Sequence, residues 1–177
     1  MVWRGPMVTT ALQQLLHDTA WDNLDYLIID LPPGTGDIQL TLAQKIPVTG
    51  AVIVTTPQDI ALLDVQKAVR MFEKVRVPII GVVENMSVHV CEACGHEAHI
   101  FGQGGGARLA AEYGIEFLGA LALSQAIRER ADEGNPIVVS EPEGPIAQQY
   151  LAIADKIRAQ LIVLEAKRSK FPRIVVE

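Results

Sequence analysis

The stretch YLIIDLPPGTGD, residues 26–37, decides the fold that we expect for this chain. Its apolar run ends in the carboxylate of Asp30, and two prolines and two glycines follow. A run that is apolar at nearly every position predicts a parallel strand, here residues 26–30, covered on both faces. An acid at the end of such a strand, beside backbone N–H groups that glycine leaves accessible, suits a phosphate and its metal ion. We therefore expect Asp30 to lie beside Mg²⁺ and Gly34 and Gly36 to approach a terminal phosphate.

Short apolar runs alternate with amphipathic segments along the rest of the chain. Further strands are expected at residues 50–55, 79–83 and 117–121, and helices at residues 7–18, 38–45, 107–113, 124–133 and 145–165, with another long helix that begins near Asp59 and ends before Pro78. This order is typical of right-handed βαβ units, and so of an α/β fold with a parallel sheet flanked by helices. We expect a single domain over residues 1–177, interrupted by a polar insertion at about 86–106.

Composition excludes several classes of function. The net charge of −6 argues against non-specific binding to nucleic acid, which needs clustered Lys and Arg. No apolar run reaches 18 residues, so no membrane-spanning helix is expected, and the first residues do not have the pattern of a signal peptide. We expect a cytoplasmic protein, in which two neighbouring cysteines indicate metal or redox chemistry before a structural disulfide.

The insertion carries those two cysteines in the order Cys91-x-x-Cys94-Gly95. This spacing is typical of a metal knuckle, in which two thiolates share a tight turn that glycine permits. One knuckle supplies two ligands, so the others must come from nearby histidines, giving Cys₂His₂ zinc, or from a second copy of the chain, giving Cys₄ for zinc or an iron–sulfur cluster. A thioredoxin-type redox pair and two incidental thiols are the remaining alternatives.

The phosphate site that residues 30–37 indicate is incomplete in this chain. It needs a G-x-x-x-x-G-K-[ST] loop, and the chain contains none; the glycine-rich residues 102–106 have no Lys-Ser/Thr after them. The alternative for residues 30–37 is a strand-to-helix turn capped by Asp37. The amide of Asn85 matches the N6/N7 edge of adenine, although Asn at a strand end is also ordinary turn chemistry. Gln58 is equally ambiguous, and Asp59 is expected to cap the helix that follows.

Several segments together resemble the Mrp/ApbC family, the iron–sulfur cluster carrier ATPases related to MinD. The resemblance runs nearly the whole length of the chain, and its most specific parts are PPGTGD and ENMS. The matching stretches are WRGPM (3–7), LDYLIIDLPPGTGD (24–37), TTPQD (55–59), GVVENMS (81–87), CxxCG (91–95) and IFGxGGG (100–106).

The resemblance implies a MinD-like P-loop NTPase fold and a homodimer. It also implies a bridging 4Fe–4S cluster that Cys91 and Cys94 of two chains hold and that passes to apo iron–sulfur proteins under control of ATP and Mg²⁺. By resemblance, Asp30 is the catalytic Mg²⁺-linked acid. Nucleotide contacts are expected from Gly34, Gly36, Gln58 and Asn85. The alternative is a MinD-like nucleotide-dependent enzyme or switch with a structural zinc knuckle.

The chain departs from the family pattern in two places. The family's Walker A loop lies upstream of the first matching segment, so we expect this chain to be the C-terminal half or two-thirds of a family member. Without that loop, the chain alone is expected to be inactive as an ATPase. The family usually has proline where Ala122 stands, in a loop expected near the nucleotide base. We therefore make no prediction for this part of the contact with the base.

Overall fold

The structure, a computed structural model, describes residues 5–31, 46 and 48–168. Its centre is a parallel sheet in the order β1-β2-β5, formed by β1 (Ala51–Thr55), β2 (Ile79–Glu84) and β5 (Phe117–Ala120). In the register, Thr55 lies beside Glu84, which in turn lies beside Ala120. Three of the expected strands are therefore confirmed, with boundaries that differ by one residue at an end.

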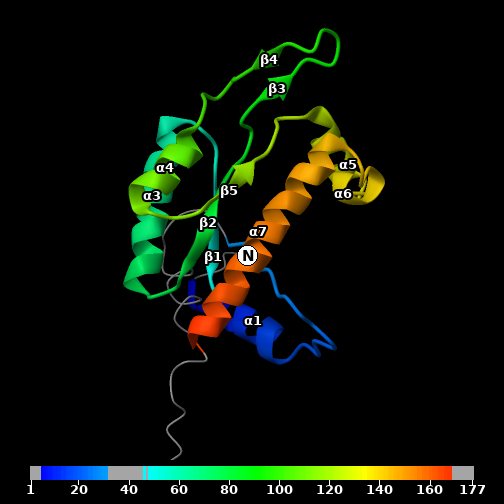
Figure 1. The fold of residues 1–177 in the computed structure, drawn as a ribbon. Helices are drawn as coiled ribbons and strands as arrows, with labels where there is room; N and C mark the ends of the chain where they lie inside the picture. Colours follow the sequence, from blue (N-terminus) through cyan, green and yellow to red (C-terminus); the bar gives the residue numbers. More distant parts are fainter. Residues whose placement is uncertain (1–4, 32–45, 47, 169–177) are drawn as a thin grey trace, which may run out of the picture.

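Helices cover both faces of this sheet, as expected for parallel strands (Figure 1). On one face lie α3 (Asp59–Lys74) and α4 (Gly105–Tyr113). On the other lies the long helix α7 (Pro145–Arg168), whose Ile153 packs with Val83, Leu118 and Leu121. The larger apolar cluster, on the α3–α4 side, contains Ile53, Val69, Met71, Phe72, Val77, Val82, Leu109 and Ala110.

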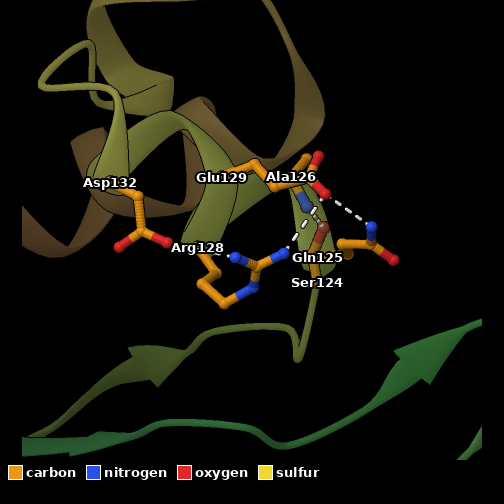
Figure 2. Close-up of polar contacts among 6 residues, drawn as sticks. All are labelled: Ser124, Gln125, Ala126, Arg128, Glu129 and Asp132. Atoms are coloured by element: carbon orange, nitrogen blue, oxygen red, sulfur yellow. Dashed lines mark hydrogen bonds and ion pairs between the residues drawn. The ribbon is translucent and has the colours of Figure 1, made fainter.

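Two short helices, α5 (Gln125–Asp132) and α6 (Ile137–Ser140), follow β5. Ser124 caps α5, because its hydroxyl accepts a hydrogen bond from the Ala126 N–H at 3.2 Å (Figure 2). Arg128 forms ion pairs with Asp132 at 3.0 Å and with Glu129 at 3.2 Å. No residue of α5 is buried, and exposed pairs of this kind contribute little to stability.

The strand expected at residues 26–30 is not formed. These residues have no regular secondary structure, and Ile28 is 91 % exposed. The helix expected at residues 7–18 is confirmed as α1 (Gly5–His17), on which the side chain of Leu15 is exposed. Apolar composition favours a strand only where a neighbouring strand supplies hydrogen bonds and a surface to pack on, and within the described residues no strand pairs with this run. Only Leu31, just after the run, packs against the larger cluster.

Several expectations lie outside the described residues. These are the phosphate-contacting Gly34 and Gly36, the alternative cap Asp37, and the helix at residues 38–45. Within the described part of the chain, no helix is long and apolar enough to cross a membrane.

Candidate functional site

The two cysteines lie at the tip of a hairpin that projects from the carboxyl end of β2 (Figure 1). Its arms are β3 (His89–Val90) and β4 (Glu97–Ala98), which pair in antiparallel register. The Cys91 N–H donates to the His96 carbonyl at 2.9 Å, and the Gly95 N–H donates to the Cys91 carbonyl at 2.8 Å. Gly95 has φ +70°, in the left-handed region that favours glycine. The turn predicted from the C-x-x-C-G spacing is therefore present.

Both thiols are free, and Cys94 is exposed whereas Cys91 is half-buried. Hydrogen bonds from the backbone of Cys94 and Ala93, and then from the Cys94 side chain, hold the pKa of the Cys91 thiol below its ordinary value. Burial and the nearby charge of Glu92 oppose this shift without cancelling it. A thiolate is the form that binds metal, so the turn favours the ligating state of Cys91.

Histidines hold the stem of the hairpin and do not complete a metal site with the thiols. His89 Nδ1 lies 3.1 Å from the Leu123 carbonyl oxygen, and His99 Nδ1 lies 2.8 Å from that of Ser87. A carbonyl oxygen only accepts, so Nδ1 is the donor in both contacts. Among the residues that the structure describes, no three His, Cys, Asp or Glu side chains form a group that could hold a metal ion. The described part of one chain thus offers two thiols and no third ligand.

Glu84, at the end of β2, is a residue of this region for which no role was predicted. Its carboxylate accepts hydrogen bonds from the Gly106 N–H at 2.7 Å and from the Gly104 N–H at 3.3 Å. The N–H groups at the start of α4 therefore bind the carboxylate of Glu84. The start of a helix can also bind a phosphate, but here the protein's own side chain occupies that position. The sequence feature that could have indicated this contact is an acid directly after an apolar strand, with three consecutive glycines about twenty residues later.

The residues expected to contact nucleotide lie beside the base of the hairpin. Asn85 is half-buried, and its N–H donates to the Thr55 carbonyl at 2.7 Å, so the ends of β1 and β2 are joined. Its side-chain oxygen accepts from the Met86 N–H at 2.9 Å. Within the described residues no hydrogen bond uses the two N–H groups of this amide, so both can serve a ligand. Gln58 accepts from the Thr56 hydroxyl at 3.1 Å. Gln58, and not Asp59, is the N-cap residue of α3, although its side chain makes no capping bond.

Asp30 is exposed. Within the described residues, no hydrogen bond or ion pair joins its carboxylate to Asn85 or to the cysteine hairpin. The structure thus brings Asn85 together with the ends of β1 and β2, but it does not connect Asp30 with them. The assignment of Asp30 to Mg²⁺ stays a prediction.

Comparison with known proteins identifies the family. A model of the ParA family, described as a NUBPL iron-transfer P-loop NTPase, matches residues 1–158. The chain belongs to this family. The relationship expected from PPGTGD and ENMS is therefore confirmed, and with it the α/β P-loop class of the fold.

Curated relatives agree with this family. The chain is 62 % identical over 154 residues to an iron-sulfur cluster carrier protein of Pseudomonas fragi, covering 87 % of this chain and 54 % of that one. It is 58 % identical over 161 residues to the protein of the same name from Escherichia coli K12, covering 91 % and 44 %. It is 50 % identical over 179 residues to the iron-sulfur cluster transfer protein NUBPL of Dictyostelium discoideum, covering 99 % and 55 %. The chain spans about half the length of these relatives.

Solved structures show the same fold. A nucleotide-binding protein from Archaeoglobus fulgidus, in complex with ADP, superposes with a TM-score of 0.68 at 38 % identity, covering 79 % of this chain and 56 % of that chain. The cell division ATPase MinD of Pyrococcus furiosus superposes with a TM-score of 0.62 at 21 % identity, covering 88 % and 59 %. At that identity the likeness to MinD supports the fold alone.

Proposed function

We propose that this chain carries the cluster-binding part of an iron–sulfur cluster carrier. The observation that carries the proposal is the hairpin tip, where Cys91 and Cys94 lie on one turn and one thiol is biased toward its thiolate form. The curated relatives named as cluster carrier or transfer proteins support the same cargo. In this proposal the cluster is cargo, which the chain binds and passes to apo-proteins.

The number of ligands implies a second copy of the chain. A 4Fe–4S cluster takes four thiolates, and each chain contains two cysteines. Two hairpins facing one another across a twofold axis would supply the set, and such symmetry is the commonest arrangement in homo-oligomers. The protrusion of the hairpin from the sheet leaves its tip accessible to a partner (Figure 1). We therefore propose a homodimer that bridges one 4Fe–4S cluster.

ATP, with Mg²⁺, is proposed to control cluster transfer in the full-length protein. The N–H groups of the Asn85 amide, which have no partner among the described residues, suit adenine, and they lie at the carboxyl ends of β1 and β2, where ligands of parallel sheets bind. The relative that was solved with ADP supports nucleotide binding in this family. Gly34, Gly36 and Gln58 are proposed as further nucleotide contacts, and Asp30 as the acid linked to Mg²⁺.

Anaerobic reconstitution with iron and sulfide tests the cargo. We expect thiolate-to-iron absorption, an iron content equal to half a 4Fe–4S cluster per chain, and a dimer by analytical ultracentrifugation. Cys91→Ala and Cys94→Ala should each abolish the absorption. His96→Ala is the matched control, because His96 is exposed near the same turn and is not a proposed ligand, so that variant should load normally.

Metal analysis distinguishes this function from a structural zinc knuckle. Protein purified without air and without added metal is measured for iron and zinc. Stoichiometric zinc that persists through reconstitution, with no uptake of iron, would overturn the carrier proposal and favour the alternative of a nucleotide-dependent switch.

A further inference from the structure

Glu84 is a buried carboxylate at the point where the chain leaves the sheet for the cysteine hairpin. The residue is 3 % exposed. Its two oxygens accept the N–H groups of Gly104 and Gly106, which stand where the chain returns from the hairpin to α4. One side chain therefore joins the two ends of the segment that carries Cys91 and Cys94.

The returning segment fits closely against the sheet because it consists of glycine. A Cβ atom on Gly106 would approach the Cβ of Glu84 to 3.0 Å, and one on Gly105 would approach the Pro57 carbonyl oxygen to 2.7 Å. Gly104, the N-cap residue of α4, has φ +69°. The start of a helix also carries a partial positive charge that favours a carboxylate. Close packing and electrostatics thus both support the contact with Glu84.

We propose that Glu84 is a positioning residue that fixes the direction in which the cysteine hairpin leaves the sheet. This inference rests on the proposed cluster binding, because a cluster shared by two chains requires both hairpins to be held in one orientation. Hydrogen bonds from Ser87 to Leu121 and from His89 to Leu123 fix one side of the stem, and Glu84 fixes the other. Glu84 also precedes Asn85, so the same contact connects the hairpin to the proposed nucleotide end of the sheet.

Glu84→Gln tests the proposal with little change of shape. Glutamine has one acceptor oxygen where glutamate has two, so one of the two glycine N–H bonds is lost. We expect hydrogen exchange in peptides covering residues 85–106 to accelerate about tenfold, while exchange in β2 and β5 changes by less than about twofold. Glu112→Gln, which removes an exposed carboxylate from α4, is the control and should leave all these rates unchanged.

Two further measurements distinguish a role of Glu84 in positioning the hairpin from a role in the stability of the fold alone. Loss of the reconstituted cluster to a chelator should be several-fold faster in Glu84→Gln than in Glu112→Gln. Phenylarsine oxide, which bridges two thiols of one hairpin, should bind both variants equally, because the relation of Cys91 to Cys94 is internal to the turn. If Glu84→Gln does not fold, Gly106→Ala disturbs the same contact from the other side and should give the same exchange pattern.

The outcomes distinguish this inference from the proposed function. Unchanged exchange at residues 85–106, or equal acceleration in the hairpin, β2 and β5, would overturn the positioning role. If the unaltered chain takes up no cluster while Glu84→Gln still loosens the hairpin alone, the carrier function is wrong and the mechanical role of Glu84 stands.

Discussion

The backbone N–H of Cys91 donates to the carbonyl of His96 at 2.9 Å, and this bond closes the turn that places both thiols at the hairpin tip. The same turn directs the N–H groups of Ala93 and Cys94 toward the Cys91 sulfur and lowers the pKa of its thiol. The geometry of the turn therefore determines the ionisation of the Cys91 thiol, which is a proposed cluster ligand. Changes to the turn should alter thiol ionisation and cluster binding together.

Alkylation of Cys91 should report the lowered pKa directly. We expect the rate of reaction with iodoacetamide, followed by peptide mass spectrometry, to rise with pH around a midpoint lower than that of the same thiol in urea. The stability that this shift contributes is fully present above the unfolded pKa and is lost as pH falls through the folded pKa. Cys94→Ala should raise the midpoint only part of the way, because the backbone donors remain. Equal midpoints in the folded and unfolded chain would contradict the prediction.

Gly95 should tolerate asparagine better than alanine. Its φ of +70° costs about 1–2 kcal/mol for most L-residues, and asparagine adopts this region more readily. Apart from Gly95 and its two neighbours in the chain, no atom of the described residues lies within 4 Å of a Cβ built at Gly95, so the penalty comes from the backbone and not from a clash. Gly95→Ala should therefore speed chelator-driven cluster loss by about 5- to 30-fold. Gly95→Asn should stay closer to the unaltered protein, and a reversed order of the two variants would be inconsistent with this account.

Gly81 is required by packing between β2 and β5. A Cβ atom there would lie 2.5 Å from Leu118 Cγ and 2.7 Å from the Glu116 carbonyl oxygen. Because Leu118 is buried and the second contact is backbone, neither can move away easily. We expect Gly81→Ala to lower the free energy of unfolding by about 3 kcal/mol in urea titration. Gly134→Ala, at a position with φ +71° in open space, is the matched control and should cost about 1 kcal/mol.

The three strands of the sheet were predicted correctly, because in the fold each of these apolar runs has a neighbouring strand on one or both sides and helices over its faces. The runs that became β1, β2 and β5 pack against α3 and α4 on one side and α7 on the other. Residues 26–30 have the same composition, yet no strand forms, since composition does not specify a neighbouring strand. A sequence pattern thus predicts what a segment can become, and tertiary contact decides whether it does.

In the candidate site, too, some residues could be predicted from the sequence and others could not. The turn at Cys91, Cys94 and Gly95 was predictable, because its chemistry is local and depends on residues within one turn. The role of Glu84 was not, because its partners lie 20 and 22 residues further along the chain. An acid at the end of a strand is equally consistent with a metal ligand, a helix cap or a catalytic base, and only the fold brings Gly104 and Gly106 to it.

The 177-residue chain should not hydrolyse ATP. It contains no G-x-x-x-x-G-K-[ST] loop, and each charge-assisted hydrogen bond missing from a phosphate costs about 1.5–3 kcal/mol. Phosphate release with ATP and Mg²⁺ should equal the background, with and without the cluster. Turnover that disappears in Asp30→Ala would overturn this expectation and would show that Asp30 acts without that loop.

Ile28 should contribute little to the stability of this chain, although its run reads as a buried strand. At 91 % exposure, its side chain has little packing to lose. Ile28→Lys should therefore change the free energy of unfolding by no more than about 0.5 kcal/mol, and it should reduce aggregation by interrupting an exposed apolar run. Ile53→Ala, at a β1 position that is 5 % exposed, is the contrasting variant and should cost about 2–5 kcal/mol. A large loss in Ile28→Lys would mean that residues 26–30 pack as a strand in solution, and would restore the interpretation that the sequence first favoured.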